Sequence, residues 1–382
     1  MRRTEQLLAE LVALPSVNPA FAPPDKSTAW QTRHLYGEQR VADFLAATAA
    51  KAGLDIEFQK VLPGRSNLIV RLLPPQKIKQ TILLAPHLDT VGADEAGFVP
   101  QKKNGRLYGR GACDTKGCVA AMLSAVCELA ASKSRPQATQ IVFAGLIDEE
   151  QAQAGSRALV ASGFKADLAI VGEPTKLQLV TAHKGSLWLH LETRGRAAHG
   201  ATPRLGKNAI HEMARVVDYL ESGYAAELRR RKHPLLGTAT INVGKISGGT
   251  QPNIVPASCS IAVDRRTLPG ETVKSVCREI TARLRARHLT AKVFNSKLAP
   301  APALETDPTL PLVRHFFACL GQTKPLGVHY FCDAAVLAAG GIPGVVFGPG
   351  DIAQAHTVDE WISLSQLERG RNLLVKFLKS LP

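Results

Sequence analysis

The feature that most constrains the fold of this 382-residue chain is an alternation of short apolar runs with amphipathic stretches. Residues 81–86, 139–147 and 167–172 are apolar runs of strand length, and residues 116–130 place apolar side chains at helical intervals. Strands have this composition when helices cover a mostly parallel sheet. The same alternation returns towards the end of the chain, with a helix, a strand and a helix expected at 309–320, 344–348 and 363–380. We therefore predict an α/β fold with a mostly parallel, mixed sheet.

The middle of the chain has a different pattern. Residues 187–192, 238–246 and 257–264 alternate apolar and polar side chains, as strands with one solvent-exposed face do. Two amphipathic helices are expected among these strands, near 210–220 and at 272–287. This arrangement predicts an inserted α+β domain of ferredoxin-like type. The expected divisions of the chain are a catalytic domain formed by 1–177 and 298–382, and the inserted domain at 178–297.

Composition narrows the class of protein. Hydrophobic residues make up 45% and charged residues 21%, which excludes a disordered chain, and the net charge of +15 favours anionic partners. The seven cysteines form no CxxC pair and are expected to be reduced. Apolar residues between Leu7 and Leu14 recur at helical spacing, which favours a first helix over a signal peptide. No apolar run has membrane-spanning length, so we expect a cytoplasmic protein that does not bind a membrane.

Imidazoles and carboxylates follow several of the expected strands. His87 and Asp89 end one strand and project to the same side, because they are two residues apart. Asp114 lies in the glycine-rich segment GRGACDTKG, which lacks the GK[ST] of a phosphate loop and would place a carboxylate against phosphate. The other candidates end or follow further strands: Asp148, Glu149, Glu150, Glu173 and His356.

Each of these pieces has an ordinary structural explanation, such as a solvated acidic run or a helix-capping aspartate. Together, two imidazoles and several carboxylates without thiolates suit a pair of hydrolytic metals such as Zn²⁺, Mn²⁺ or Co²⁺. One glutamate of the acidic run could coordinate while its neighbour acts as a general base. Other hydrolase templates fit less well: GxSxG is absent, and Arg215 replaces the second histidine of an HExxH motif at His211-Glu212. Cys113 and Cys118 are expected to pack in the core.

The ordered motifs PHLDTV, GRGACDTKG, DEE, GEPT and GPGDIAQAHTVDEW resemble those of the M20 metallopeptidase family, over essentially the whole chain. The last motif is most similar to the acetylornithine deacetylase group of that family. The resemblance implies two divalent metals, with Zn²⁺ first and Co²⁺ or Mn²⁺ as alternatives. It assigns His87 and Glu173 to one metal, Glu150 and His356 to the other, and Asp114 to both. It also implies that Asp89 orients His87 and that Glu149 is the general base.

The resemblance further implies that the inserted domain is a lid and a dimerisation surface of a homodimer. His199, in AAHGATP, would reach a neighbouring subunit's active site and hold the oxyanion. Asn253, in QPNIVP, and Arg265, in VDRRTLPG, would bind the substrate carboxylate, with Arg266 turned to the opposite face by strand alternation.

The activity implied is hydrolysis of the amide bond of a small anionic N-acyl amino acid, first of all conversion of N-acetylornithine to ornithine and acetate in arginine biosynthesis. Succinyl-diaminopimelate desuccinylase, aminoacylase, and dipeptidase or carboxypeptidase activities are the alternatives within the family. A nucleic-acid-binding protein is a distant alternative, motivated by the net charge and by clusters such as Arg229–Lys232. Because aromatic residues are only 5% of the chain, we expect no nucleic-acid partner. A catalytically inactive binding protein is the other alternative.

Overall fold

The computed structural model describes residues 3–22, 33–296 and 299–382. Two compact units are present: unit 1, formed by Met1–Thr181, Thr306–Leu326 and Cys332–Pro382, and unit 2, formed by Ala182–Glu305 and Gly327–Phe331. The predicted domain boundary between residues 297 and 298 lies outside the described residues. The other predicted boundary, between residues 177 and 178, falls shortly before strand β8 (Val180–His183), which begins in unit 1 and ends in unit 2.

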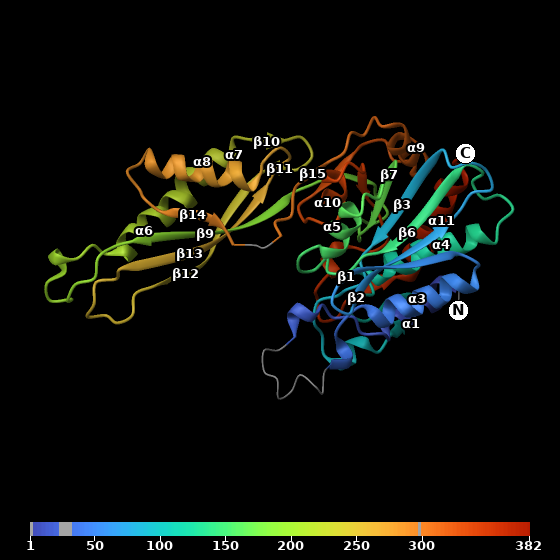
Figure 1. Ribbon diagram of the computed structural model, residues 1–382, viewed down its shortest axis with the longest axis horizontal. Coiled ribbons are helices and arrows are strands. Elements are labelled where there is room, and N and C mark those ends of the chain that lie inside the picture. The colour runs from blue at the N-terminus through green and yellow to red at the C-terminus, as the bar shows by residue number, and fades with distance from the viewer. Residues whose placement is uncertain (1–2, 23–32, 297–298) are drawn as a thin grey trace. The chain divides into compact units, whose positions relative to one another are not determined.

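The centre of unit 1 is a mixed sheet, which Figure 1 shows. In order across the sheet, the strands that lie wholly in unit 1 are β1 (Asp55–Leu62), β2 (Arg65–Leu72), β6 (Thr139–Gly145), β3 (Gln80–Pro86), β7 (Leu168–Gly172) and β17 (Gly344–Val346), and β8 follows β17. Strands β6, β3, β7 and β17 are parallel to one another, whereas the β1–β2 hairpin adds two antiparallel strands beside β6. This confirms the predicted α/β fold with a mostly parallel, mixed sheet.

Helix α4 (Lys116–Ala130) is buried along nearly its whole length and packs against β3, β6 and β7. Its buried length explains why its sequence is apolar on all sides. The other helices of unit 1 are α1 (Arg3–Val12), α3 (Gln39–Lys51), α5 (Ala154–Ala161), α9 (Pro311–Leu320), α10 (Ala334–Ala339) and α11 (Leu364–Lys379). Of these, α1, α3 and α11 contact α4, while α5 and α10 contact each other. Among the described residues, none of the helices has both the length and the apolar character required to cross a lipid bilayer.

A small antiparallel sheet joins the C-terminal part of unit 1 to the segment that precedes α4. Its strands are β18 (Trp361–Ser363), β5 (Arg106–Tyr108) and β4 (Gln101–Lys103), and Trp361 pairs with Tyr108. This pairing places the residues before β18 beside the residues after β5, although about 250 positions separate them in the sequence.

Unit 2 contains an antiparallel sheet with helices packed on it (Figure 1). In order, its strands are β12 (Thr240–Gly248), β13 (Ser258–Thr267), β9 (Gly185–Arg194) and β14 (Lys292–Asn295). Apolar side chains on one face of β9 and β13 form a core with helices α6 (Ala209–Tyr219) and α8 (Val273–Arg285). The capping box of Thr272 and Ser275 starts α8. Shorter elements complete the unit: α7 (Ala225–Arg229), β10 (Lys232–His233), β11 (Gly237–Thr238), β15 (Leu304–Glu305) and β16 (Leu326–Val328), the last beginning in unit 1.

Candidate metal centre at the strand ends

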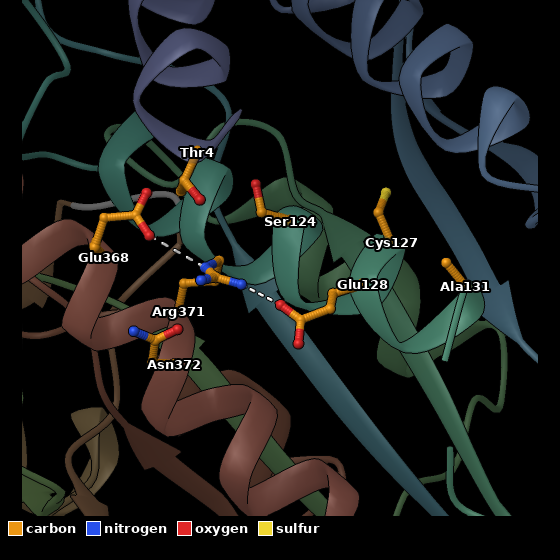
Figure 2. A pocket seen from close by; sticks show the side chains of 8 residues that line it. All are labelled: Thr4, Ser124, Cys127, Glu128, Ala131, Glu368, Arg371 and Asn372. Atoms are coloured by element: carbon orange, nitrogen blue, oxygen red, sulfur yellow. Dashed lines mark hydrogen bonds and ion pairs between the residues drawn. The ribbon is translucent and has the colours of Figure 1, made fainter. Parts of the chain in front are cut away.

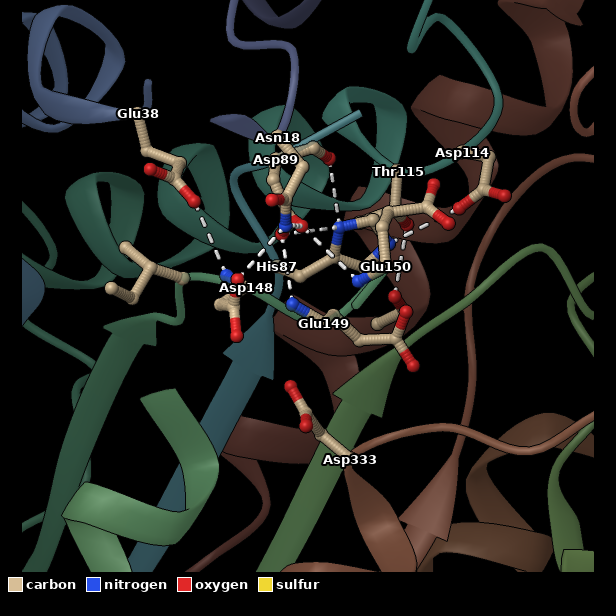
Figure 3. Close-up of polar contacts among 12 residues, drawn as sticks. Asn18, Glu38, His87, Asp89, Asp114, Thr115, Asp148, Glu149, Glu150 and Asp333 are labelled. Carbon is tan, nitrogen blue, oxygen red and sulfur yellow. Dashed lines mark hydrogen bonds and ion pairs between the residues drawn. The ribbon is translucent and has the colours of Figure 1, made fainter. Parts of the chain in front are cut away.

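The carboxyl ends of three neighbouring strands supply most of the candidate residues. His87 directly follows β3, Glu173 directly follows β7, and Glu149 and Glu150 lie shortly after β6. Because β6, β3 and β7 are parallel neighbours, these ends meet at one edge of the sheet. Figure 3 shows the side chains of this edge gathered in one place.

Asp114 lies between the two histidines. Its Oδ1 is 3.1 Å from Nε2 of His87, and its Oδ2 is 3.4 Å from Nε2 of His356. Asp114 comes from the segment between β5 and α4, and His356 from the loop between β17 and β18. Two histidines more than 250 positions apart therefore face the two oxygens of one carboxylate.

One glutamate accompanies each histidine. Oε1 of Glu173 is 4.0 Å from Nε2 of His87, and Oε1 of Glu150 is 3.3 Å from Nε2 of His356. Ligand atoms of His87, Asp114 and Glu150 all lie within 4.8 Å of one another. The arrangement is thus two His–Glu pairs with Asp114 between them.

Asp89 contacts both His87 and the acidic loop, which is formed by residues 148–150. The backbone oxygen of Asp89 lies 2.9 Å from Nδ1 of His87, which leaves Nε2 of the imidazole facing Asp114. The Asp89 carboxylate accepts hydrogen bonds from the backbone N–H groups of Glu149 and Glu150, each at 3.1 Å. A buried amide, Asn18, donates to the same carboxylate at 2.8 Å.

The acid–base properties of the cluster reflect burial and crowding. Burial raises the pKa of Glu149 and Glu173 well above the usual value, and neighbouring carboxylates add to this. Burial opposes ionisation of Asp114, but hydrogen bonds to His356 and His87 hold its pKa below the usual value. Hydrogen bonds to Asp114 and Glu150 raise the pKa of His356 to about 10. The negative charge of these buried carboxylates therefore favours cationic partners in the site.

Two observations indicate that these residues can bind divalent cations. Hard oxygen and imidazole ligands converge from five separate segments, and buried carboxylates outnumber the cationic groups beside them. Cys113 and Cys118 are buried, and burial raises the pKa of both thiols, so they remain protonated core residues. The structure brings together Asp89, Glu149 and the five predicted ligands.

The predicted residues of the inserted domain belong to unit 2. The backbone of His199 forms an isolated bridge with Ile254, which places the exposed His199 and Asn253 on adjoining loops. The side chain of Arg265, which the resemblance assigned to the substrate carboxylate, is 0% exposed and pairs with Glu271. Arg266 lies on the opposite face of β13 and remains partly exposed.

The sequence contained a signal for the burial of Arg265. Cys259, Ile261 and Val263 are apolar residues on one face of β13, and alternation continues that face to Arg265. An arginine that continues an apolar face is expected to be buried and paired.

Several residues that support the cluster were not identified from the sequence. Arg65 pairs with Glu38 and with Asp148, which precedes the two glutamates of the acidic loop. Asp333, at the start of α10, bonds Ser156 through one oxygen, and burial raises its pKa to about 6. Figure 3 shows Asp333 pointing towards the acidic loop. These partners come from distant segments, so no local pattern identifies them.

Unit 1 also contains a pocket away from the strand-end cluster. A cavity of about 560 Å³ lies between α1, α4 and α11 and contains no histidine among its lining residues (Figure 2). Arg371 pairs there with Glu128 and lies 3.4 Å from Glu368, so its carboxylates already have a cation beside them. The strand-end cluster, which has an excess of carboxylates, is the better metal site.

Comparison with known proteins shows the family of this chain. The family model described as "Peptidase family M20/M25/M40" matches residues 83–380. The acetylornithine deacetylase of Proteus mirabilis (strain HI4320) is 31% identical over 389 residues, covering 98% of this chain and 96% of that protein. The acetylornithine deacetylase of Edwardsiella ictaluri (strain 93-146) is 30% identical, with coverage of 97% and 96%.

Solved structures share the fold. Aminopeptidase PepT from Bacillus cereus has a TM-score of 0.77 at 23% identity, covering 99% of this chain and 97% of that chain. The YXEP protein of Bacillus subtilis, described as a dinuclear metal binding peptidase from the M20 family, has a TM-score of 0.71 at 13% identity, with the same coverage.

Proposed function

Because this chain belongs to the M20/M25/M40 peptidase family, we propose that it is a two-metal deacetylase that converts N-acetylornithine to ornithine and acetate. The family relationship makes it a metal-dependent hydrolase of amide bonds. The observation that carries the two-metal proposal is the Asp114 carboxylate, whose two oxygens face His87 and His356 separately. The curated relatives named acetylornithine deacetylase support the choice of substrate.

In this proposal His87, Glu173 and Asp114 hold one metal, and His356, Glu150 and Asp114 hold the other. Zn²⁺ suits this donor set, with Co²⁺ and Mn²⁺ as alternatives. When bound, the metals lower the pKa of water and stabilise negative charge on the amide oxygen. Glu149 accepts the proton of the attacking water and delivers it to the leaving amine.

Asp89 acts through its neighbours in this scheme. Its backbone oxygen fixes the ring of His87, and its carboxylate fixes the backbone of Glu149 and Glu150. The base and one ligand of each metal are thus positioned by a single buried residue.

We test the function with a panel of small amides. Protein loaded with Zn²⁺ or Co²⁺ is offered N-acetylornithine, other N-acetyl amino acids, N-succinyl-diaminopimelate and dipeptides, and release of acetate, succinate and amino acids is measured. We expect the highest kcat/KM with N-acetylornithine, and background activity after chelation that metal restores. A higher kcat/KM for another member of the panel would contradict the substrate, whereas failure to hydrolyse any amide would contradict the function.

We propose that Arg266, which pairs with Asp264, contacts the substrate carboxylate in place of Arg265, because Arg266 is the partly exposed one of the two arginines. Arg266→Ala should raise KM by about 10- to 100-fold with a smaller change in kcat, since a charged hydrogen bond is lost. Arg265→Met should instead lower the free energy of unfolding by about 3–5 kcal/mol, because Glu271 loses the nearer of its two cationic partners, Arg231 being 3.9 Å away. Steady-state kinetics and denaturant unfolding distinguish these effects, and an unchanged KM in Arg266→Ala would exclude the contact.

The structure gives little support to the alternative of a nucleic-acid-binding protein. Arg231 pairs with Glu279 and Arg283 with Glu227, so part of the basic surface of unit 2 is neutralised by its own acids. The homodimer, and the role of His199 in it, stay predictions of the resemblance. We also propose a cytoplasmic location, supported by seven cysteines that form no disulfide.

A further inference from the structure

Glu360 lies four residues after His356, and its buried carboxylate is surrounded by N–H donors. All of these donors belong to the segment that ends at Asp114, almost 250 positions earlier in the chain. Oε1 accepts from the backbone N–H groups of Cys113 at 2.8 Å and Asp114 at 2.9 Å. Oε2 accepts from the backbone N–H of Gly111 at 2.9 Å and from the guanidinium of Arg110 at 2.7 Å.

The segment that Glu360 holds has little other regular structure to fix it. Gly109 and Gly111 have φ angles of 143° and 82°, which a helix or strand does not contain. A side chain at Gly111 would also lie 2.9 Å from atoms of Lys116 and Thr90, so the backbone passes close to its neighbours. Three backbone N–H groups of this segment, those of Gly111, Cys113 and Asp114, are satisfied by the one carboxylate of Glu360. The N–H groups of Arg110 and Ala112 bond the backbone oxygens of Gly97 and Gly109 instead.

The position of Asp114 depends on this support. Its backbone N–H is bonded to Glu360, and its carboxylate lies between His87 and His356. The segment that supplies Glu360 also supplies His356, and β18 pairs with β5 immediately beyond it. One stretch of chain therefore provides a histidine of the cluster and the anchor of the carboxylate that this histidine faces.

We propose that Glu360 is a positioning residue that fixes Asp114 between the two sets of metal ligands. The inference rests on the proposed two-metal function, and it adds a residue that touches neither metal nor substrate. Glu360 acts through the backbone of residues 111–114, so its loss is expected to weaken both metals together.

The test is Glu360→Gln, with Glu368→Gln as the matched control. Both residues are buried glutamates of the C-terminal segment, so each variant removes one buried negative charge. Glu368 instead lies 3.4 Å from Arg371 and lines the pocket of Figure 2. In Glu360→Gln an amide NH₂ replaces one acceptor oxygen and opposes the donors that faced it.

We expect Glu360→Gln to lower the affinity for both metal equivalents by about 10- to 100-fold and to change the visible absorption of the Co²⁺-loaded protein. Glu368→Gln should match the wild type in both measurements, even if its melting temperature falls. Glu360→Asp keeps the charge and should recover part of the affinity. If Glu360→Gln does not fold, Arg110→Met removes one donor and should weaken both metals in the same direction.

Unchanged metal affinity and an unchanged Co²⁺ spectrum in Glu360→Gln would overturn the proposal, as would equal losses in Glu360→Gln and Glu368→Gln. A loss at one metal alone would also contradict it, because Asp114 faces both ligand sets. Binding of fewer than two metal equivalents by the wild-type protein would instead contradict the proposed two-metal function. Failure of this inference and failure of the function are therefore distinguishable.

Discussion

The Glu149→Gln variant is expected to lose about 10²- to 10⁴-fold in kcat while it keeps both metal ions. Glutamine has nearly the same size and shape as glutamate, so the buried position stays filled. It cannot accept a proton, and the attacking water then lacks its base. The two His–Glu pairs and Asp114 remain unchanged, because Glu149 takes part in none of the contacts among them.

Metal analysis and steady-state kinetics on the same preparation measure this result. Gln151→Ala is the matched control, since Gln151 is an exposed residue of the same loop, and it should keep wild-type kcat and metal content. Loss of metal from Glu149→Gln would show that Glu149 is a ligand. Retention of wild-type turnover would show that another group accepts the proton.

The candidate cluster could be predicted because its ligands follow strands that the sequence marks clearly. The buried parts of parallel strands such as β3 and β7 are apolar, so the first polar residue after each strand stands out. Parallel strands end at one edge, so His87 and Glu173 could be expected to lie close together. This reasoning requires only the order and direction of the strands.

The elements at the edge of the sheet were harder to predict. Strand β1 mixes charged and apolar residues and is at most half-buried, so its sequence lacks the apolar run that identified β3 and β7. Its pairing with β2 depends on contacts that the sequence alone does not reveal.

The supporting residues of the cluster could not be predicted for a related reason. Asn18, Arg65 and Glu360 each reach the site from a segment far away in the sequence. A single asparagine or glutamate in a loop is usually solvated, and only tertiary structure shows that these are buried and bonded. Arg265 is the opposite case, because the alternation of β13 continues its apolar face to this position, a local signal that the assignment from the family resemblance did not use.

Replacement of Asp114 should have the broadest effect of any single change, since each of its two carboxylate oxygens faces one of the two histidines. Asp114→Asn removes the negative charge and converts one acceptor oxygen into a donor, which then faces an imidazole. We expect affinity for both metals to fall and kcat/KM to drop by about 10³-fold or more, consistent with a loss of several kcal/mol of charge stabilisation. His356→Ala should differ, because His87 and Glu173 still hold one metal.

Isothermal titration with Zn²⁺ or Co²⁺, together with metal analysis after dialysis, distinguishes these variants. Asp351→Asn is the control, because it makes the same chemical change in the loop that carries His356, at a carboxylate paired with Lys176. It should keep two metal equivalents. If Asp114→Asn instead loses one equivalent and binds the other with wild-type affinity, Asp114 serves a single metal. The two His–Glu pairs would then be independent sites, and one carboxylate would not join them.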